Sequence, residues 1–373
     1  GTEALANYYL LHSHESLRGQ VSNAVYGRKN AGDSVYTTLD VDLQMAAYEA
    51  LGDKNGAVVV TNPTTGEILA MVSKPDFDPN TLKEIWEEIV EDKDNSVLLN
   101  RATQGLYAPG STFKIVTTLQ YLKENNNDID SYEYDCEGSF VLDESVISCY
   151  HGTKHAKVDL KESFAQSCNA SFANIGNGLN EYSFEKTLKE LMFNSQLPLT
   201  LPTAKSSLVL DNDTTDSDML QYAIGQGDTL MTPMHINLIT QAIANDGLLM
   251  KPIILDYVTN NNGILVKDFK TDEYKQLMSQ EEAQILTEFM QEVVLSGTAT
   301  GLQNELYTVA GKTGSAEFKE NSSESHAWFT GFAPVDNPQI CVTVIVEEGG
   351  SGSRASVPIA KKIMDVYFEA LAQ

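Results

Sequence analysis

The sequence of 373 residues has no long apolar run, and it is poor in basic residues. No stretch of about 18 apolar residues occurs, so no segment of it is predicted to span a bilayer. The 25 lysines and arginines are outnumbered by 52 aspartates and glutamates, which gives a formal net charge of -27. A surface of that sign repels phosphate backbones, so nucleic acid is not an expected partner.

Cysteine is also scarce, with four residues at Cys136, Cys149, Cys168 and Cys341 and no Cys-x-x-Cys pair. No group of cysteines and histidines has the spacing of a common zinc motif, so no metal site is predicted. Cys136 and Cys149 flank one short segment and can form a disulfide if the protein is exported. Two free thiols are the alternative.

Several motifs that carry chemistry in other enzymes are missing. There is no Gly-x-Ser-x-Gly to support an α/β-hydrolase triad, and there is no Gly-x-Gly-x-x-Gly or Walker loop to bind phosphates. Hydrophobic residues nevertheless make up 42% of the chain, which is enough for a sizeable core. The sequence therefore indicates a folded, acidic protein whose chemistry depends on other side chains.

The hydrophobic pattern predicts a mixture of helices and strands from residue 36 onward, after a polar segment (1–35) with a short helix near 3–11. Two apolar runs around the turn residues 62–66 predict a hairpin. Further strands are predicted at 308–315, 326–333 and 340–346, and helices at 81–93, 112–124, 162–178, 232–246 and 357–371. This order predicts an α/β fold of the α+β type, with helices packed on an antiparallel sheet.

Ser111 follows the helix breaker Pro109-Gly110 and stands at the start of a helical pattern. Residues i and i+3 share a helix face, so Lys114 can reach the Ser111 hydroxyl. A buried lysine loses its charge readily and can then accept the serine proton. The same Ser-x-x-Lys pattern recurs at Ser183-Phe-Glu-Lys186, which is interpreted as an exposed helix turn.

Two further motifs follow Ser111 in order. Ser167-Cys-Asn169 is the only Ser-x-Asn of the chain, and Lys312-Thr-Gly314 is the only Lys-Thr-Gly or Lys-Ser-Gly. Together, Ser-x-x-Lys, Ser-x-Asn and Lys-Thr-Gly resemble the signature of penicillin-binding proteins and class A β-lactamases. Ser183 fails this test because the Ser-x-Asn motif precedes it.

Each motif residue has a chemical role that fits acyl transfer. Ser167 can relay a proton to a leaving amine, and Asn169 can hold both Lys114 and a substrate amide by hydrogen bonds. Lys312, on an edge strand, can supply positive charge that lowers the pKa of its neighbours and attracts a carboxylate. Gly314 allows a substrate backbone to approach. The backbone N–H groups of Ser111 and Ser315 can bind the oxyanion.

The flanking residues extend this similarity well beyond the three motifs. At these positions the chain resembles the class B penicillin-binding proteins, the monofunctional transpeptidases of bacterial elongation and division. The resemblance covers about residues 36–373, and the segments that carry it are 62–71, 100–114, 165–169, 223–227, 232–236 and 311–317. It implies a β-lactamase/transpeptidase-like fold for 36–373, in which an antiparallel sheet is sandwiched between helical layers. It further implies that 1–35 are a linker or a remnant of an N-terminal non-catalytic module.

The resemblance also implies a reaction. Ser111 would attack the penultimate carbonyl of a peptidoglycan stem peptide ending in D-Ala-D-Ala, and an amine of a second stem would resolve the acyl-enzyme. β-Lactam antibiotics would acylate the same serine, and Thr313 and Ser315 would bind the substrate carboxylate. No metal or organic cofactor is expected. The implied partner is a membrane-embedded glycan polymerase of the cell-wall machinery, and the implied location is the extracytoplasmic face of the cytoplasmic membrane, with an anchor that this chain does not contain.

Two departures and two alternatives accompany the resemblance. Many relatives have threonine where this chain has Ser315, although the hydroxyl is kept, and no candidate for the deacylating glutamate of class A β-lactamases lies near Ser167. That absence favours a long-lived acyl-enzyme over β-lactam hydrolysis. The motifs do not distinguish the transpeptidase from a D,D-carboxypeptidase, or from a β-lactam-sensing domain that acylates without turnover.

Overall fold

The computed structural model describes residues 2–27, 29, 31–92, 95–317 and 324–371, which include all of the predicted site residues. At its centre is a five-stranded sheet with the strand order β12-β13-β14-β2-β3, in which every neighbouring pair is antiparallel. The strands are β2 (Gly56–Thr61), β3 (Ile68–Lys74), β12 (Ala310–Glu317), β13 (Ser325–Ala333) and β14 (Ile340–Val346). The predicted hairpin and the three predicted C-terminal strands are confirmed.

Burial along the strands explains their order in the sheet. β2 and β14 are continuous runs rich in β-branched residues and are buried at every position, as expected for strands covered on both faces. β3, at one edge, alternates between buried and half-buried positions, which is the pattern of a strand with one covered face. β12 forms the other edge, so Lys312 does lie on an edge strand, as predicted.

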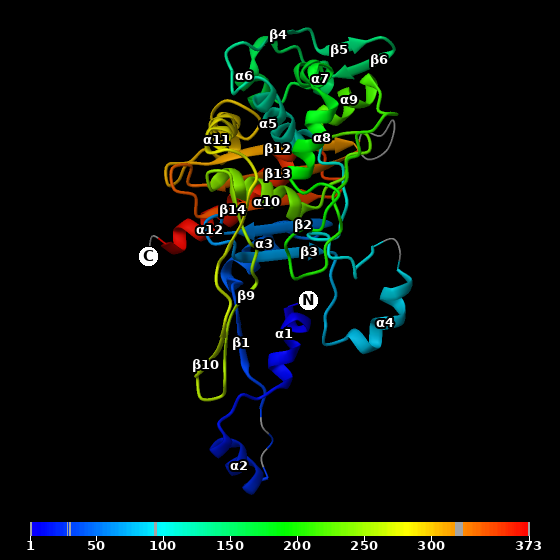
Figure 1. The fold of residues 1–373 in the computed structure, drawn as a ribbon. Coiled ribbons are helices and arrows are strands. Elements are labelled where there is room, and N and C mark those ends of the chain that lie inside the picture. The colour runs from blue at the N-terminus through cyan, green and yellow to red at the C-terminus, as the bar shows by residue number, and fades with distance from the viewer. Residues whose placement is uncertain (1, 28, 30, 93–94, 318–323, 372–373) are drawn as a thin grey trace.

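Helices cover both faces of this sheet (Figure 1). α10 (Pro233–Ala244) and α11 (Gln280–Leu295) pack on one face, and α3 (Val41–Leu51) and α12 (Gly352–Leu371) pack on the other. α10 is buried at all of its positions. The predicted sheet between helical layers is confirmed, although α12 begins five residues earlier than the pattern indicated.

A second group of helices lies beyond the β12 edge (Figure 1). It consists of α5 (Lys114–Glu124), α6 (Leu160–Ala165), α7 (Asn169–Gly178), α8 (Glu181–Glu190) and α9 (Asp216–Ala223). The single helix predicted over 162–178 is wrong, because residues 166–168 interrupt it and Ser167 has a positive φ of 57°. The break turns the Ser-x-Asn motif into a loop between two helices.

Two small sheets cover the outer side of these helices. β4 (Glu133–Cys136) pairs with β7 (Ala156–Asp159), and β5 (Ser139–Leu142) pairs with β6 (Ser145–Ser148). The sequence pattern did not indicate these strands, since each has only four residues. The short 3-10 helices are η1 (Gly110–Phe113), η2 (Tyr150–Gly152) and η3 (Thr300–Leu302).

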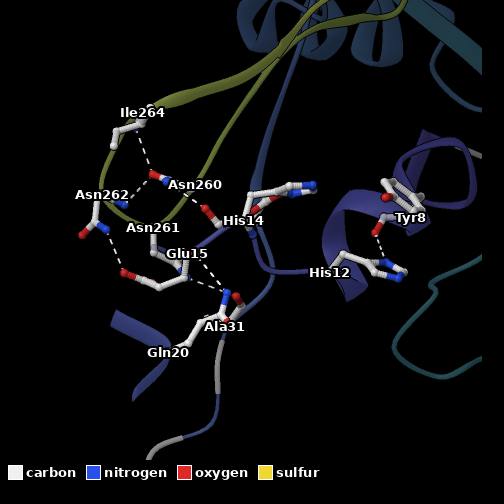
Figure 2. Close-up of polar contacts among 11 residues, drawn as sticks. Tyr8, His12, His14, Glu15, Gln20, Ala31, Asn260, Asn261, Asn262 and Ile264 are labelled. Carbon is white, nitrogen blue, oxygen red and sulfur yellow. Dashed lines mark hydrogen bonds and ion pairs between the residues drawn. The ribbon is translucent and has the colours of Figure 1, made fainter. Parts of the chain in front are cut away.

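The N-terminal residues extend away from the central sheet together with a long hairpin (Figure 1). The elements are α1 (Thr2–Leu11), α2 (Leu17–Val25), β1 (Ser34–Thr37), β9 (Leu255–Thr259) and β10 (Leu265–Asp268), with β1-β9-β10 forming one sheet. Figure 2 shows how the turn after β9 holds this segment: Asn260 Nδ2 donates to His14 O at 3.1 Å, and Asn262 Nδ2 donates to Glu15 Oε1 at 2.8 Å.

The remaining elements are α4 (Leu82–Glu91) and the pair β8 (Leu248–Met250) and β11 (Glu273–Gln276). The helix predicted over 81–93 is confirmed as α4, except that residue 93 lies outside the described residues. Within the described part of the chain, no helix has the length and apolar character that crossing a membrane requires.

Candidate active site

The backbone around Ser111 is fixed by a close approach of two loops and a strand. Ser111 lies in η1, which continues directly into α5. Gly110 has φ +53°, and a Cβ added there would come 2.7 Å from Ser315 O in β12. The Gly110 N–H donates to Gly225 O at 2.9 Å. Only glycine suits this position, and as a result Ser111 is held against the edge strand.

Lys114, one turn later, points back at the serine. Its Nζ donates to Ser111 Oγ at 3.1 Å and to Asn169 Oδ1 at 2.7 Å. It also donates to the carbonyl of Ser167 at 2.8 Å and lies 3.2 Å from Ser167 Oγ. The side chain is completely buried. The first two motifs are therefore in direct contact through a single amine.

Lys312 connects the third motif to the hydroxyl of Ser167. Its Nζ donates to Ser167 Oγ at 2.9 Å and to the carbonyl of Thr313 at 3.2 Å. Lys312 is also completely buried. The positive φ of Ser167 presents both its carbonyl and its hydroxyl to the two amines. Five residues that were predicted to be catalytic, Ser111, Lys114, Ser167, Asn169 and Lys312, thus form one continuous set of hydrogen bonds.

Burial controls the charge on these amines. It lowers the pKa of Lys114 to about 7, and the nearby thiols of Cys168 and Cys149 oppose this shift. Burial also lowers the pKa of Lys312 well below its usual value, and the charge of Lys114 lowers it further. The sequence predicted that the charge of Lys312 would lower the pKa of Lys114, but in the structure burial is what lowers it. A buried lysine with a pKa near 7 can act as a base.

The residues predicted to bind substrate, Thr313, Gly314 and Ser315, line a cleft of about 360 Å³. Ser111, Ser167 and Asn169 line the same cleft. Thr313 Oγ1 lies 2.6 Å from Thr298 Oγ1, and Ser315 Oγ accepts a hydrogen bond from the Gly352 N–H at 3.4 Å.

Arg354 also lines the cleft, and the sequence analysis missed it. It is the one arginine or lysine among the described lining residues. It lies in the first turn of α12, just before the helix predicted over 357–371, and no motif surrounds it. A cation at the mouth of the cleft can attract a substrate carboxylate.

The second Ser-x-x-Lys pattern has a different environment. Ser183 lies in the first turn of α8, and its hydroxyl donates to Glu124 Oε1. Lys186 Nζ is 3.8 Å from Glu190 Oε1, an exposed pair along the same helix. The structure gives this serine no lysine partner among the described residues, in agreement with its interpretation as an ordinary helix turn.

The sequence spacing predicted no metal site, yet the fold brings three cysteines and a histidine together. Cys136, Cys149, Cys168 and His155 bring their potential ligand atoms to within 4.8 Å of one another. The Sγ atoms of Cys136 and Cys149 are 3.7 Å apart, and both thiols are free, so there is no disulfide between them. The spacings of 13 (149 − 136) and 19 (168 − 149) match no common zinc motif. Sequence spacing could not reveal the cluster because its members come from the end of one strand and from three connecting segments.

Comparison with known proteins decides the family. The penicillin-binding protein transpeptidase domain family matches residues 56–365, which is most of the chain. The chain belongs to this family. Its Ser-x-x-Lys, Ser-x-Asn and Lys-Thr-Gly motifs converge in the structure, and the resemblance predicted from them is confirmed.

Relatives within the penicillin-binding transpeptidase family cover nearly the whole chain. The peptidoglycan D,D-transpeptidase PbpA of Mycolicibacterium smegmatis is 30% identical, over 97% of this chain and 78% of that protein. The ceftriaxone acyl-enzyme of penicillin-binding protein A from M. tuberculosis superposes with a TM-score of 0.88 at 27% identity, over 98% of this chain and 87% of the other. A chain of a peptidoglycan synthase complex that coordinates polymerization and crosslinking superposes with a TM-score of 0.79 at 29% identity. That match covers 91% of this chain but only 63% of the other chain.

Proposed function

We propose that this protein is a peptidoglycan D,D-transpeptidase that works through a Ser111 acyl-enzyme. One observation carries the proposal: a completely buried lysine, whose pKa burial lowers to about 7, lies with its Nζ 3.1 Å from Ser111 Oγ. A serine hydroxyl needs a base at this distance before it becomes a useful nucleophile.

The first half-reaction begins with neutral Lys114 taking the proton of Ser111. Ser111 Oγ then forms a bond to the penultimate carbonyl carbon of a stem peptide ending in D-Ala-D-Ala. The backbone N–H groups of Ser111 and Ser315 stabilise the oxyanion, which lies beside the start of α5 and strand β12. When the intermediate collapses, the peptide C–N bond breaks and D-alanine leaves as an amine.

The leaving amine needs a proton, and Ser167 is placed to deliver it. Its hydroxyl is hydrogen-bonded to Lys312 and lies 3.2 Å from Lys114, so the proton taken from Ser111 can return through it. Asn169 holds Lys114 by a 2.7 Å hydrogen bond throughout. In the second half-reaction an amine of another stem peptide attacks the ester, and the same groups move the proton in the opposite direction.

Substrate binding adjusts the charge of the two lysines. The terminal carboxylate of the stem peptide is bound by Thr313, Ser315 and Arg354 in the cleft above Lys312. A carboxylate brought close to a buried amine raises the pKa of that amine. Lys312 then takes up a proton, and its charge in turn favours neutral Lys114. The substrate thereby helps to keep Lys114 neutral, the form that accepts the proton of Ser111.

β-Lactams fit the same cleft as mimics of the substrate. The acyl-enzyme that the M. tuberculosis relative forms with ceftriaxone supports this extension to the present chain. Acylation at Ser111 opens the lactam ring, and the amine that is freed stays attached to the acyl group. No deacylating glutamate was found near Ser167 in the sequence, so the acyl-enzyme is expected to be long-lived.

The substrate places the protein on the extracytoplasmic face of the cytoplasmic membrane, where stem peptides are cross-linked. We assign residues 36–373 to the transpeptidase domain and residues 1–35 to a linker or to the end of a non-catalytic N-terminal module. The likeness to a chain of a peptidoglycan synthase complex supports a membrane-embedded glycan polymerase as partner. The hydrogen bonds of residues 14–15 with the turn after β9 would fix the orientation of an N-terminal module relative to the transpeptidase domain.

Labelling with a fluorescent penicillin tests this proposal. The wild-type protein should form one covalent adduct that survives denaturation, and Ser111→Ala should form none. Ser183→Ala is the matched control, because it removes the serine of the other Ser-x-x-Lys pattern and should leave labelling unchanged. Labelling that persists in Ser111→Ala, or that disappears in Ser183→Ala, would contradict the assignment.

A further inference from the structure

At the Ser-x-Asn motif, three thiols and an imidazole from four separate segments of the chain converge. Cys136 ends β4, Cys149 follows β6, and His155 precedes β7. Cys168 caps the N-terminus of α7 and is the middle residue of the motif. The three cysteines are buried and His155 is half-buried. Cys168 and Cys149 enter the mechanism above only through their influence on the pKa of Lys114.

We propose that Cys136, Cys149, Cys168 and His155 form a structural Zn²⁺ site that holds the catalytic loop 167–169. Zn²⁺ favours thiolate sulfur and imidazole nitrogen in tetrahedral sites, and a site with three cysteines and one histidine is a common structural type. All four ligands come from the protein, which leaves no open position for substrate. The site is therefore structural and not catalytic.

Three of the distances between the ligand atoms match such a site, and all of the ligand atoms lie within 4.8 Å of one another. Zn–S bonds of about 2.3 Å at a tetrahedral angle place two sulfur atoms about 3.8 Å apart. The Sγ atoms of Cys136 and Cys149 are 3.7 Å apart, and so are those of Cys149 and Cys168. A sulfur and a nitrogen ligand should be about 3.5 Å apart, and Cys136 Sγ lies 3.5 Å from His155 Nδ1. A disulfide would require a sulfur separation of about 2.05 Å.

Local backbone groups already point at the sulfur atoms. The Ala170 N–H donates to Cys149 Sγ and the Ser171 N–H donates to Cys168 Sγ, both at 3.4 Å. Hydrogen bonds of this kind stabilise thiolates, the form of cysteine that binds metal. The Cys149 N–H in turn donates to Gly138 O at 2.8 Å, which joins the loop after β4 to the loop after β6.

The strands around the site contain few buried apolar residues of their own. Residues 133–159 form four strands of four residues each. The apolar cluster at the site consists of the three cysteines and Ala170, with Tyr134 and Phe140 packed against it. Ile147 and Phe140 connect these strands to the main core. A unit with so small an apolar core usually depends on a disulfide or a metal. Here the sulfur atoms lie at metal-binding distances.

The site is coupled to catalysis through the chain itself. Cys168 lies between Ser167 and Asn169, whose side chains contact Lys114. Asn169 Nδ2 also donates to the carbonyl of Ser148, the residue before Cys149, at 3.0 Å. A metal bound to Cys168 and Cys149 would fix both ends of this contact. Cys168 and Cys149 are accordingly positioning residues.

Metal content is the first test, and it does not depend on the proposed reaction. The reduced protein, given one equivalent of Zn²⁺ and then desalted, should retain one zinc per chain in elemental analysis. Cys136→Ser and His155→Ala should lose it. Cys341→Ala, at the only other cysteine, and His151→Ala, at a neighbouring histidine, should keep it. Zinc that is absent from the wild type, or equally retained by Cys136→Ser, would overturn the site.

Cobalt provides a readout that needs no variant to fold. Co²⁺ added to the metal-free wild type should give the visible bands of a tetrahedral ion together with strong thiolate-to-cobalt charge-transfer absorption, and Zn²⁺ should displace it. The weak spectrum of an octahedral ion would overturn the assignment. So would an intact mass that showed a disulfide between Cys136 and Cys149 in the native protein.

Acylation by penicillin tests the coupling separately. Metal-free wild-type protein should be acylated at least about tenfold more slowly than the zinc form, and added Zn²⁺ should restore the rate. This expectation rests on the proposed function. If the protein binds zinc but both forms are acylated at the same rate, the metal site is supported and its role in positioning is overturned. If neither form is acylated, the result counts against the proposed function.

Discussion

Ser167 Oγ accepts a hydrogen bond from Lys312 Nζ at 2.9 Å, although the two residues are 145 positions apart in the chain. This contact joins the helical group that carries Ser111 to the edge of the central sheet. Lys114 lies on the other side of the same hydroxyl, at 3.2 Å. Among the residues that the structure describes, Ser167 is thus the one side chain hydrogen-bonded to both Lys114 and Lys312, which is why the proposed proton return passes through it.

Removing the Ser167 hydroxyl should slow acylation strongly and leave the fold intact. Ser167→Gly is the suitable change, because glycine accepts the positive φ of 57° at this position. Loss of a positioned proton relay should lower the rate of penicillin acylation by about 10²-fold or more. The measurement is stopped-flow acylation, with the melting temperature as control. A rate within twofold of the wild type would show that the proton takes another route.

The rate of acylation should rise with pH through about 7. Burial lowers the pKa of Lys114 to about 7, and the neutral amine is the active form. Below that pH the neutral fraction, and with it the rate, should fall about tenfold per pH unit, and above it the rate should level off. Lys114→Arg should be inactive throughout, because arginine keeps its proton. A pH-independent wild-type rate between pH 5 and 9 would exclude Lys114 as the base.

The free energy of unfolding should depend on Glu347, which binds two residues of the segment that leads to Ser111. Glu347 Oε1 accepts from Arg101 Nε at 2.8 Å and from the Tyr107 hydroxyl at 2.7 Å. The Arg101 side chain is only 4% exposed. Glu347→Ala should lower the free energy of unfolding by about 2 kcal/mol, because it leaves this arginine without its carboxylate.

An exposed pair provides the control for that measurement. Glu49 Oε2 lies 3.4 Å from Lys362 Nζ, and both side chains are about half exposed. Glu49→Ala should change the free energy of unfolding by less than about 1 kcal/mol in the same urea titration. If the two variants proved equally stable, the buried contact would have no structural role.

The choice of acceptor distinguishes the transpeptidase from its alternatives. A stem pentapeptide supplied alone should release D-alanine slowly, and adding an amine acceptor should increase turnover and yield a cross-linked product. Chromatography of the products measures both outcomes. Release of D-alanine without any cross-linked product would identify a D,D-carboxypeptidase. One equivalent of D-alanine followed by no further turnover would identify a β-lactam-sensing domain.

The main architecture could be predicted from the sequence because its strands and helices are long and strongly patterned. β14 is an almost continuous apolar run and α10 has apolar residues at helical spacing, and the boundaries of both agree with the prediction within two residues. The motifs predicted which distant residues would meet, since Ser111, Ser167 and Lys312 stand in an order that chance seldom produces.

Other features could not be read from pattern alone. The break between α6 and α7 depends on the positive φ of Ser167, which no local signal indicated. The strands of 133–159 are too short to show periodicity, so the convergence of Cys136 with Cys168 was hidden. Arg354 was missed because its role depends on how α12 meets the cleft and not on its sequence neighbours.

Peptide mapping of the penicillin adduct tests the central claim most directly. Trypsin should release residues 102–114, which contain Ser111, and residues 162–186, which contain both Ser167 and Ser183. After incubation with benzylpenicillin, mass spectrometry should find the added mass on Ser111 in the first peptide. An adduct confined to the second peptide, or no adduct on the folded protein, would contradict the account.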